Sequence, residues 1–327
     1  MASSSNGPTA PATAAAAVPA PPTPQRLPLD PQGFPLDPQG LALVARMELV
    51  ARTAVEGLLS GLHPSPYFGS SVEYADHRPY TPSDELRSLD WKLLAKTDKY
   101  YVKLFEEQTN TRITVILDTS RSMAFSGGDG PTKLDYGRFL AAAVCHLALK
   151  QNDAAGLATF DRAVRSYIPP RSAANHFRHI LTDLGRATPG ADTSVSTSLR
   201  ELAGRIPKRG IVVLISDLID DPAGIAAGLS LLAHMRHDLI VFHLVDPVER
   251  TFPFEKVTRF RDMEGEGRIV TNPRQVRAAY LERFGAFLAA MRSACLERKI
   301  GYELTQTDLP YAEVLASYLA RRGRVTG

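Results

Sequence analysis

From residue 111 onward, short apolar runs of strand length alternate with longer segments whose apolar residues recur at helical spacing. Strands are expected at 112–117, 155–160, 164–168, 210–215 and 239–245, and helices at 133–150, 175–184, 194–205 and 223–236. Runs that are apolar throughout indicate strands buried on both faces, and their alternation with helices predicts strand–helix–strand units. The expected fold class is therefore α/β, with a doubly wound, mostly parallel sheet covered by helices on both faces.

Additional segments flank this alternating region. Helical spacing at 41–62, at 274–299 and at 311–321 predicts three more helices, and a short strand is expected near Tyr302. We divide the chain accordingly into a tail (1–40), an N-terminal segment (41–110), the α/β core (111–247) and a C-terminal segment that packs on the core (248–327).

The tail differs from the rest of the chain in composition. Ten of the 24 prolines lie in residues 1–40, and residues 1–24 are largely Ala, Pro, Ser and Thr. Such a segment buries too little apolar surface to offset the entropy lost on ordering, so we expect it to be disordered. The sequence Pro-Leu-Asp-Pro-Gln-Gly occurs in it twice, at 28–33 and at 35–40. Two copies favour an extended linker, with a docking motif as the alternative.

Composition also limits the class of protein. The 38 basic and 35 acidic residues give a net charge of +3, which does not suggest a nucleic-acid-binding protein. No basic start precedes an apolar core in the tail, and no stretch reaches 18 apolar residues, so we expect neither a signal peptide nor a membrane span. Cys145 and Cys295 lie in helix-like segments and are expected to be buried thiols. We therefore expect a cytoplasmic protein.

Four aspartates follow directly after predicted strands: Asp118, Asp161, Asp217 and Asp246. In open α/β sheets, ligands bind beyond the carboxyl ends of the strands. We therefore expect a functional site near one or more of these aspartates.

One of these positions begins a loop with several oxygen-bearing side chains, Asp118-Thr119-Ser120-Arg121-Ser122. One carboxylate and two hydroxyls on a tight loop are hard oxygen ligands of the kind that Mg²⁺ or Mn²⁺ prefers. Asp217 adds a second carboxylate, and Thr193 adds a hydroxyl from a loop between them, with Asp192 as an alternative ligand. The alternative to a metal site is that Asp118 caps a helix and Asp217 ends a strand.

This combination resembles the metal-ion-dependent adhesion site of von Willebrand factor A domains. The matching residues are Asp118, Ser120 and Ser122, then Thr193, then Asp217. The resemblance implies that the hydroxyls approach the cation directly and that the carboxylates often act through water. It also implies that one coordination position stays open for an acidic group of a partner.

A second resemblance extends over roughly residues 60–320. It rests on motifs that occur in order along the chain: Arg78-Pro79-Tyr80, Asp84-Glu85-Leu86-Arg87-Ser88-Leu89-Asp90-Trp91, Lys96, Val102-Lys103, Phe105-Glu106-Glu107, the Asp118 loop, Val245-Asp246-Pro247-Val248-Glu249, Phe260-Arg261-Asp262-Met263-Glu264 and Thr307-Asp308-Leu309-Pro310. These motifs resemble the bacterial family called domain of unknown function fifty-eight. The resemblance implies a von Willebrand factor A core, and a MoxR-type AAA+ ATPase as companion in chaperone-like assembly or maturation of other proteins.

Part of this signature has two interpretations. The residues concerned are Arg78, Asp84, Arg87, Asp90 and Trp91. They either form an ion-pair and aromatic cluster that fixes the segment against the sheet, or they form a surface that contacts a partner, since Trp and Arg are frequent interface anchors.

The sequence lacks the motifs of several enzyme classes. It contains no P-loop, no Gly-x-Gly-x-x-Gly, no Gly-x-Ser-x-Gly and no His-Glu-x-x-His. We therefore predict a non-enzymatic, metal-dependent protein-binding module that engages an acidic residue of an AAA+ ATPase or of its client. The alternatives are a Mg²⁺-dependent phosphoester hydrolase and a scaffold that binds no metal.

Overall fold

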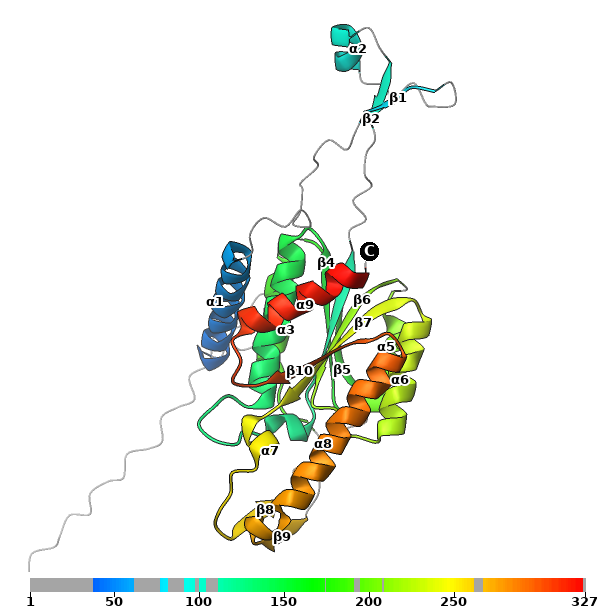
Figure 1. Ribbon diagram of the computed structural model, residues 1–327. Helices are drawn as coiled ribbons and strands as arrows, with labels where there is room; N and C mark the ends of the chain where they lie inside the picture. Colours follow the sequence, from blue (N-terminus) through cyan, green and yellow to red (C-terminus); the bar gives the residue numbers. More distant parts are fainter. Residues whose placement is uncertain are drawn as a thin grey trace, which may run out of the picture.

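The computed structural model describes residues 38–61, 77–81, 91–97, 100–103, 111–173, 175–190, 195–207, 209–261 and 267–325. A six-stranded sheet runs through the body (Figure 1). Its strands lie in the order β10 (Gly301–Gln306), β7 (His237–Val245), β6 (Gly210–Ser216), β3 (Arg112–Asp118), β4 (Ala154–Phe160) and β5 (Val164–Arg171). All neighbouring strands are parallel except β4 and β5, which are antiparallel. The predicted α/β class and mostly parallel sheet are confirmed.

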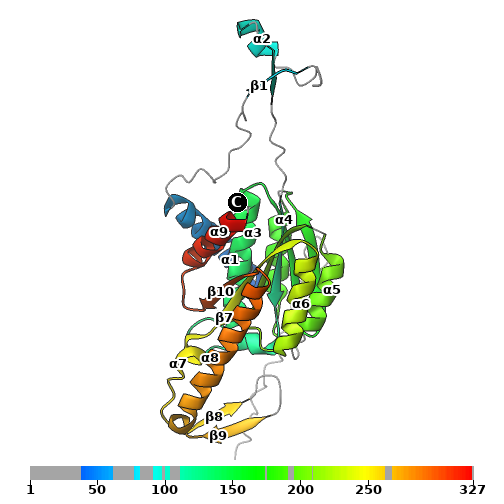
Figure 2. The ribbon, with the colours of Figure 1, turned by 45° about the vertical axis from the view of Figure 1, so that its right-hand side comes forward.

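Helices cover the sheet on both faces (Figure 2). One layer holds α1 (Pro38–Gly61), α3 (Lys133–Lys150), α4 (His176–Arg186) and α9 (Tyr311–Val325). The other layer holds α5 (Val195–Arg205), α6 (Pro222–His234) and α8 (Pro273–Glu297). Along β6, Val213 and Ile215 pack against the first layer, whereas Val212 and Leu214 pack against the second. Because the side chains of β6 alternate between two buried faces, this strand is apolar on both sides.

Several helices begin at residues whose side chains accept a hydrogen bond from a free backbone N–H group. The side chain of Thr132 caps α3 by accepting a hydrogen bond from the N–H of Asp135, and Asp221 caps α6 through the N–H of Gly224. In α6 and α8 a proline follows the cap, at the position where a missing N–H costs nothing. These caps fix the residues at which α3, α6 and α8 begin.

Helix α1 belongs to the main hydrophobic core although it precedes the sheet in sequence. Met47, Ala51 and Val55 are completely buried in the cluster that also contains residues of α3, α4 and α9. The helix predicted at 41–62 is present and begins three residues earlier, at Pro38. Similarly, the edge strand β10 comes from residues 301–306, outside the 111–247 stretch expected to form the core.

Several short elements connect or flank the sheet. Helix α7 (Pro247–Thr251) follows β7, and the hairpin of β8 (Thr258–Arg261) and β9 (Arg268–Thr271) follows α7. The rings of Phe252, Phe254, Phe260 and Tyr280 pack together, which joins this hairpin to α8. A 3₁₀ helix, η2 (Arg121–Ala124), follows β3. Strands β1 (His77–Pro79) and β2 (Tyr101–Lys103) pair with each other, and α2 (Trp91–Thr97) lies between them in sequence.

Two expectations from composition can be compared with the structure. Cys145 and Cys295 are both buried free thiols, as predicted. Within the described part of the chain, no helix has both the length and the apolar character that crossing a membrane would require.

Candidate metal site

Asp118 ends strand β3 in the middle of the sheet, and hydrogen bonds fix both of its carboxylate oxygens. Oδ1 accepts from the backbone N–H of Ser120 at 2.8 Å, and Oδ2 accepts from the hydroxyl of Ser216 at 2.6 Å. The second contact follows from strand register, because Leu117 lies opposite Ile215 and the next residues are therefore side by side. Asp118 is thus completely buried and held in one orientation.

The two predicted serine ligands lie next to this carboxylate. The hydroxyl oxygens of Ser120 and Ser122 are 3.1 Å apart, and both side chains are buried. The extended backbone of Ser120 and the 3₁₀ turn that follows bring residues two apart onto the same side of the loop. The loop therefore presents a pair of hydroxyls beside Asp118, as the Asp-x-Ser-x-Ser spacing predicts.

Asp217 brings a second carboxylate to the same edge. It directly follows Ser216, the hydrogen-bond partner of Asp118, and only 2% of its surface is exposed. Leu218 has a positive φ of 53° and its N–H donates to the Ser216 hydroxyl at 2.9 Å, so the chain turns sharply after Asp217. The structure therefore brings together four of the five residues predicted to bind metal.

The two carboxylates affect each other electrostatically. Burial, and then the neighbouring charge of Asp217, raise the pKa of Asp118 to about 7, although hydrogen bonds from Ser216 and Ser120 act in the opposite direction. Both effects favour the neutral carboxyl over the carboxylate. Asp118 therefore holds its proton more tightly than an exposed aspartate does.

The fifth predicted ligand, Thr193, and its alternative Asp192 lie outside the described residues. The described residues on either side of this gap are both fixed at the site. The N–H of Gly190 donates to the carbonyl of Thr119 at 2.7 Å, and the N–H of Val195 donates to Asp220 Oδ2 at 2.8 Å. The loop therefore leaves and rejoins the described structure beside the Asp118 loop and just after Asp217.

The other two strand-end aspartates have local partners instead. Asp161 forms an ion pair with Arg165, and Asp246 caps α7. Among the residues that the structure describes, no group of three or more His, Cys, Asp or Glu side chains is arranged to hold a metal ion. A cation at the Asp118 site would therefore depend on the serine hydroxyls as well as on the two carboxylates.

The proposed interface or structural cluster cannot be assembled from the described residues. Arg78 lies in β1 and Trp91 begins α2, but nothing is described of their side chains. Asp84, Arg87 and Asp90 lie outside the described residues altogether. Both interpretations of this cluster stay predictions.

Lys133 is a component of the site that the sequence analysis missed. Its Nζ lies 2.7 Å from Asp217 Oδ2 and 2.9 Å from Glu249 Oε1, and only 1% of the side chain is exposed. Burial lowers the pKa of Lys133, but the two carboxylates more than offset this and raise it above its usual value. A signal was present in the sequence, because a lysine as first residue of a helix opposes the helix dipole and indicates an acidic partner.

Glu249 was missed as well, although its spacing carries a signal. Asp246 and Glu249 form a capping box at α7, in which the Glu249 Oε2 accepts from the N–H of Asp246 at 2.9 Å. An acidic residue followed three positions later by Glu is the sequence pattern of that motif. The box leaves Oε1 of Glu249 free of the backbone and directed at Lys133.

The loop between η2 and α3 packs closely against α7 at Gly127. The Gly127 N–H donates to Asp246 Oδ2 at 3.0 Å, and a Cβ at this position would lie 2.3 Å from Val248 Cβ. Gly127→Ala should therefore lower the free energy of unfolding by about 1–3 kcal/mol, the usual cost of overpacking.

Urea unfolding measures this effect, with Gly128→Ala as the matched control. A Cβ on Gly128 meets nothing within 4 Å, so the control should stay close to wild type. Equal stability of the two variants would contradict the described packing of the loop on α7.

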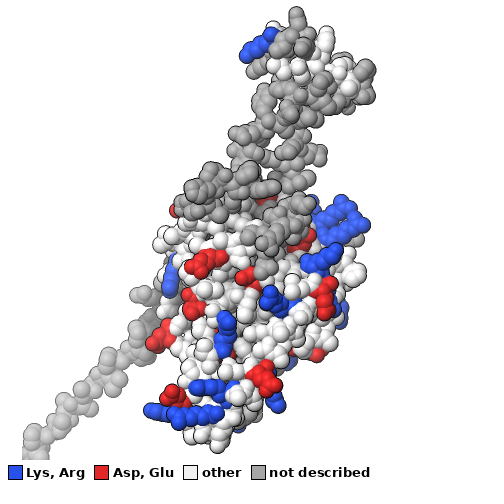
Figure 3. All heavy atoms as spheres, viewed as in Figure 1, with Lys and Arg blue, Asp and Glu red and all other residues white. Residues whose placement is uncertain are grey.

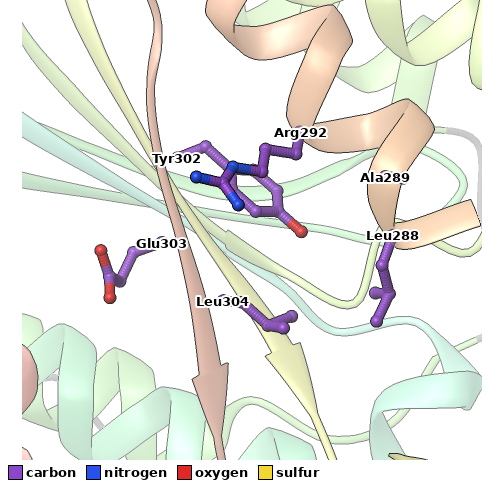
Figure 4. Close-up of a pocket in the computed structure, with 6 residues that line it drawn as sticks. All are labelled: Leu288, Ala289, Arg292, Tyr302, Glu303 and Leu304. Atoms are coloured by element: carbon purple, nitrogen blue, oxygen red, sulfur yellow. The ribbon is translucent and has the colours of Figure 1, made fainter. Parts of the chain in front are cut away.

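A surface pocket of about 440 Å³ lies between α8 and β10, separate from the Asp118 site. It is lined by Leu288, Ala289, Arg292, Tyr302, Glu303 and Leu304. Figure 4 shows Glu303 directed to the opposite side of β10 from Leu304, so the pocket lies on the α8 side of the strand. The hydroxyl of Tyr302 is hydrogen-bonded to Nδ1 of the buried His243 at 2.8 Å, which ties the pocket wall to β7.

Comparison with known proteins finds similarity to bacterial proteins whose names call them uncharacterized. An uncharacterized protein of Mycobacterium tuberculosis is 26% identical over 215 residues, which is 65% of this chain and 67% of the relative. The uncharacterized protein YeaD of Bacillus subtilis is 29% identical over 165 residues, which is 50% of this chain and 39% of the relative.

Solved structures give more distant similarities. BatB from Bacteroides thetaiotaomicron is 15% identical with a TM-score of 0.47, covering 65% of this chain and 99% of that one. An aerotolerance-related membrane protein from Bacteroides fragilis is 18% identical with a TM-score of 0.45, covering 65% of this chain and 99% of that one.

The family comparison covers most of the folded body. The model described as "Protein of unknown function DUF58" matches residues 76–286, which is more than half of the chain. The matched span includes Asp118, Ser120, Ser122, Lys133 and Asp217. The chain therefore belongs to the DUF58 family.

Proposed function

We propose that this chain is a non-enzymatic protein-binding module that holds a divalent cation, Mg²⁺ or Mn²⁺, at the carboxyl edge of β3 and β6. The observation that carries the proposal is the convergence of Asp118, Ser120, Ser122 and Asp217 from separate loops into one buried group. All four side chains offer hard oxygen atoms, the ligand type that both cations prefer. A cation there would offset the burial and the charge of Asp217, the two effects that raise the pKa of Asp118.

The order of these residues along the chain supports a von Willebrand factor A arrangement. The carboxylate and hydroxyl pair come first, Asp217 comes last, and Thr193 is the proposed ligand between them. Both described flanks of the Thr193 loop are bonded to residues close in sequence to the proposed ligands, at Thr119 and at Asp220. We therefore keep Thr193 as the proposed fifth ligand, with Asp192 as the alternative.

A cation with such ligands would bind an acidic side chain of another protein. Two carboxylates and neutral hydroxyls leave room in an octahedral shell for one further oxygen anion. The resemblance to DUF58 proteins implies a MoxR-type AAA+ ATPase as companion. We propose this ATPase, or a client that it helps to assemble or mature, as the partner.

The distribution of charge fits a protein partner better than a nucleic acid. On the face shown in Figure 3, the described Lys and Arg side chains are interspersed with Asp and Glu. Nucleic-acid binding usually depends on a continuous basic surface.

The geometry favours binding over phosphoester hydrolysis. A hydrolase would need a base beside the cation. The candidate on the neighbouring strand, His243, is buried with its ring bonded to Tyr302, and burial lowers its pKa to about 4. An imidazole with such a pKa is a weak base, and its Nδ1 is already engaged by Tyr302, so His243 is a poor candidate for the base.

A retention assay tests the proposed function. The immobilised full-length chain should retain the MoxR-type ATPase in Mg²⁺ and lose it in EDTA. The double variant Ser120→Ala and Ser122→Ala should retain less than about a tenth as much, because each lost hydroxyl removes a proposed ligand. Ser126→Ala, in the same loop but bonded only to backbone carbonyls, is the matched control. Retention that does not depend on Mg²⁺ would contradict the proposal.

A further inference from the structure

Lys133 places a buried positive charge directly against the proposed metal site. Its ammonium group lies at similar distances from two carboxylates, 2.7 Å from Asp217 Oδ2 and 2.9 Å from Glu249 Oε1. Apart from these carboxylates it faces the ring of Phe125, whose centroid is 5.6 Å away. Water has little access to this group, so its charge is screened less than that of an exposed lysine.

The two carboxylate partners differ in their attachment. Asp217 is a proposed metal ligand, and among the described residues its second oxygen, Oδ1, makes one long hydrogen bond, 3.4 Å from the N–H of Ile219. Glu249 lies outside the proposed ligand set and is fixed by the capping box of α7, which is itself bonded to the loop at Gly127. The ammonium group of Lys133 therefore interacts both with a proposed metal ligand and with a fixed carboxylate outside the ligand set.

We propose that the buried charge of Lys133 lowers the affinity of the site for the metal ion by partly neutralising Asp217. Glu249 weakens this effect because its carboxylate interacts with the same ammonium group. This inference rests on the proposed function. Lys133 is here a positioning residue, since it acts on the cation through Asp217.

The signs of the effects follow from the formal charges. Asp118, Asp217 and Glu249 with Lys133 carry a net charge of −2 when all are ionised. Lys133→Met keeps a side chain of similar length but changes the net charge to −3. Glu249→Gln changes it to −1 and leaves Asp217 as the single carboxylate partner of Lys133. A divalent cation should therefore bind more tightly to the first variant and more weakly to the second.

A purely structural role of the ion pair predicts a different pattern. Both substitutions remove one partner of a buried ion pair, and both should then lower the stability of the fold. If Lys133 and Glu249 served only to hold α7, both variants would loosen the site and weaken Mg²⁺ binding together. Opposite changes in Mg²⁺ affinity therefore distinguish the two accounts.

Calorimetric titration of Mg²⁺ into the full-length wild type and the two variants tests the inference. We expect the Mg²⁺ dissociation constant to fall at least about tenfold in Lys133→Met and to rise by a similar factor in Glu249→Gln. Lys150→Met removes an exposed lysine at the far end of α3 and should leave the constant unchanged. Thermal unfolding gives an independent readout, because the Mg²⁺-dependent rise in Tm should be larger in Lys133→Met than in wild type.

The outcomes separate this inference from the proposed function. Mg²⁺ binding by the wild type, with changes in the same direction or no change in both variants, would overturn the role of Lys133 alone. No Mg²⁺ binding by the wild type would overturn the proposed function and the inference with it. Should Lys133→Met fail to fold, Glu249→Gln keeps the ammonium in place and still tests the sign: an unchanged or tighter constant would overturn the inference.

Discussion

In Mg²⁺-free buffer, the wild type should lose stability on the order of 4 kcal/mol through Asp118 as the pH rises from about 4 to 7, and Asp118→Asn should not show this loss. Burial and the neighbouring Asp217 raise the pKa of Asp118 from 3.8 to about 7. Between these values the folded protein keeps a proton that the unfolded chain has released. The contribution of Asp118 to stability is therefore fully present below pH 4 and is lost as the pH rises to 7.

Asparagine is the right replacement because it preserves the local hydrogen bonds. Its carbonyl oxygen can accept from the N–H of Ser120 and its amide can donate to the hydroxyl of Ser216, the two groups that now contact Asp118. The variant therefore removes the titration and the charge with little change in shape. It should also lose any stabilisation by Mg²⁺, since one proposed anionic ligand is gone.

Urea unfolding at several pH values gives, for each protein, a curve of the free energy of unfolding against pH. The difference between the two curves measures the contribution of Asp118. Asp238→Asn removes an exposed carboxylate on β7 and should follow the wild type. Saturating Mg²⁺ should flatten the wild-type curve near pH 7, because a bound cation stabilises the ionised form. Parallel curves for wild type and Asp118→Asn would contradict the described environment of Asp118.

Met47→Ala should destabilise the protein by about 2–5 kcal/mol, the range for truncating a large buried side chain. Met47 is 0% exposed and lies in the cluster formed by α1, α3, α4 and α9. Removing its side chain leaves a cavity that rigid helices on several sides cannot fill. A loss of this size would show that α1 is part of the folding unit and not an appended segment.

Leu49→Ala, in the same helix, is the matched control. Leu49 is 66% exposed, so its truncation should change the free energy of unfolding by no more than about 0.5 kcal/mol. Chemical unfolding of the two variants compares them directly. Equal effects would show that α1 does not pack as described.

The sheet and its helices were largely predictable because burial on two faces leaves a simple pattern. The apolar run at 112–117 and the helical spacing at 133–150 correspond to β3 and α3 within one residue. Asp118 and Asp217 were found for the same reason, since strand ends in parallel sheets share one edge. The pairing of β3 with β6 then follows from the topology and brings these two residues together.

The short elements between β7 and α8 were harder to predict. Helix α7 has five residues, too few to show a helical period, and the strands of the β8–β9 hairpin have four each. Their stability comes from contacts distant in sequence: Arg277 of α8 donates to the carbonyls of Phe252 and Phe254. No local pattern encodes such contacts.

The charge balance of the site was also beyond sequence reasoning. Lys133 is separated from Asp217 by 84 positions and from Glu249 by 116, so nothing in a local window connects them. The opposition between Lys133 and the dipole of α3 indicates that a partner exists but not which one. Only the packing of α7 beside the start of α3 identifies Glu249.

The most direct test of the proposed metal site is anomalous diffraction from crystals of the protein grown with Mn²⁺. We predict a strong peak about 2.1 Å from the hydroxyl oxygens of Ser120 and Ser122, next to Asp118 and Asp217. The peak should be missing from crystals of Asp118→Asn grown in the same way. No peak at this position in wild-type crystals containing millimolar Mn²⁺ would contradict the account.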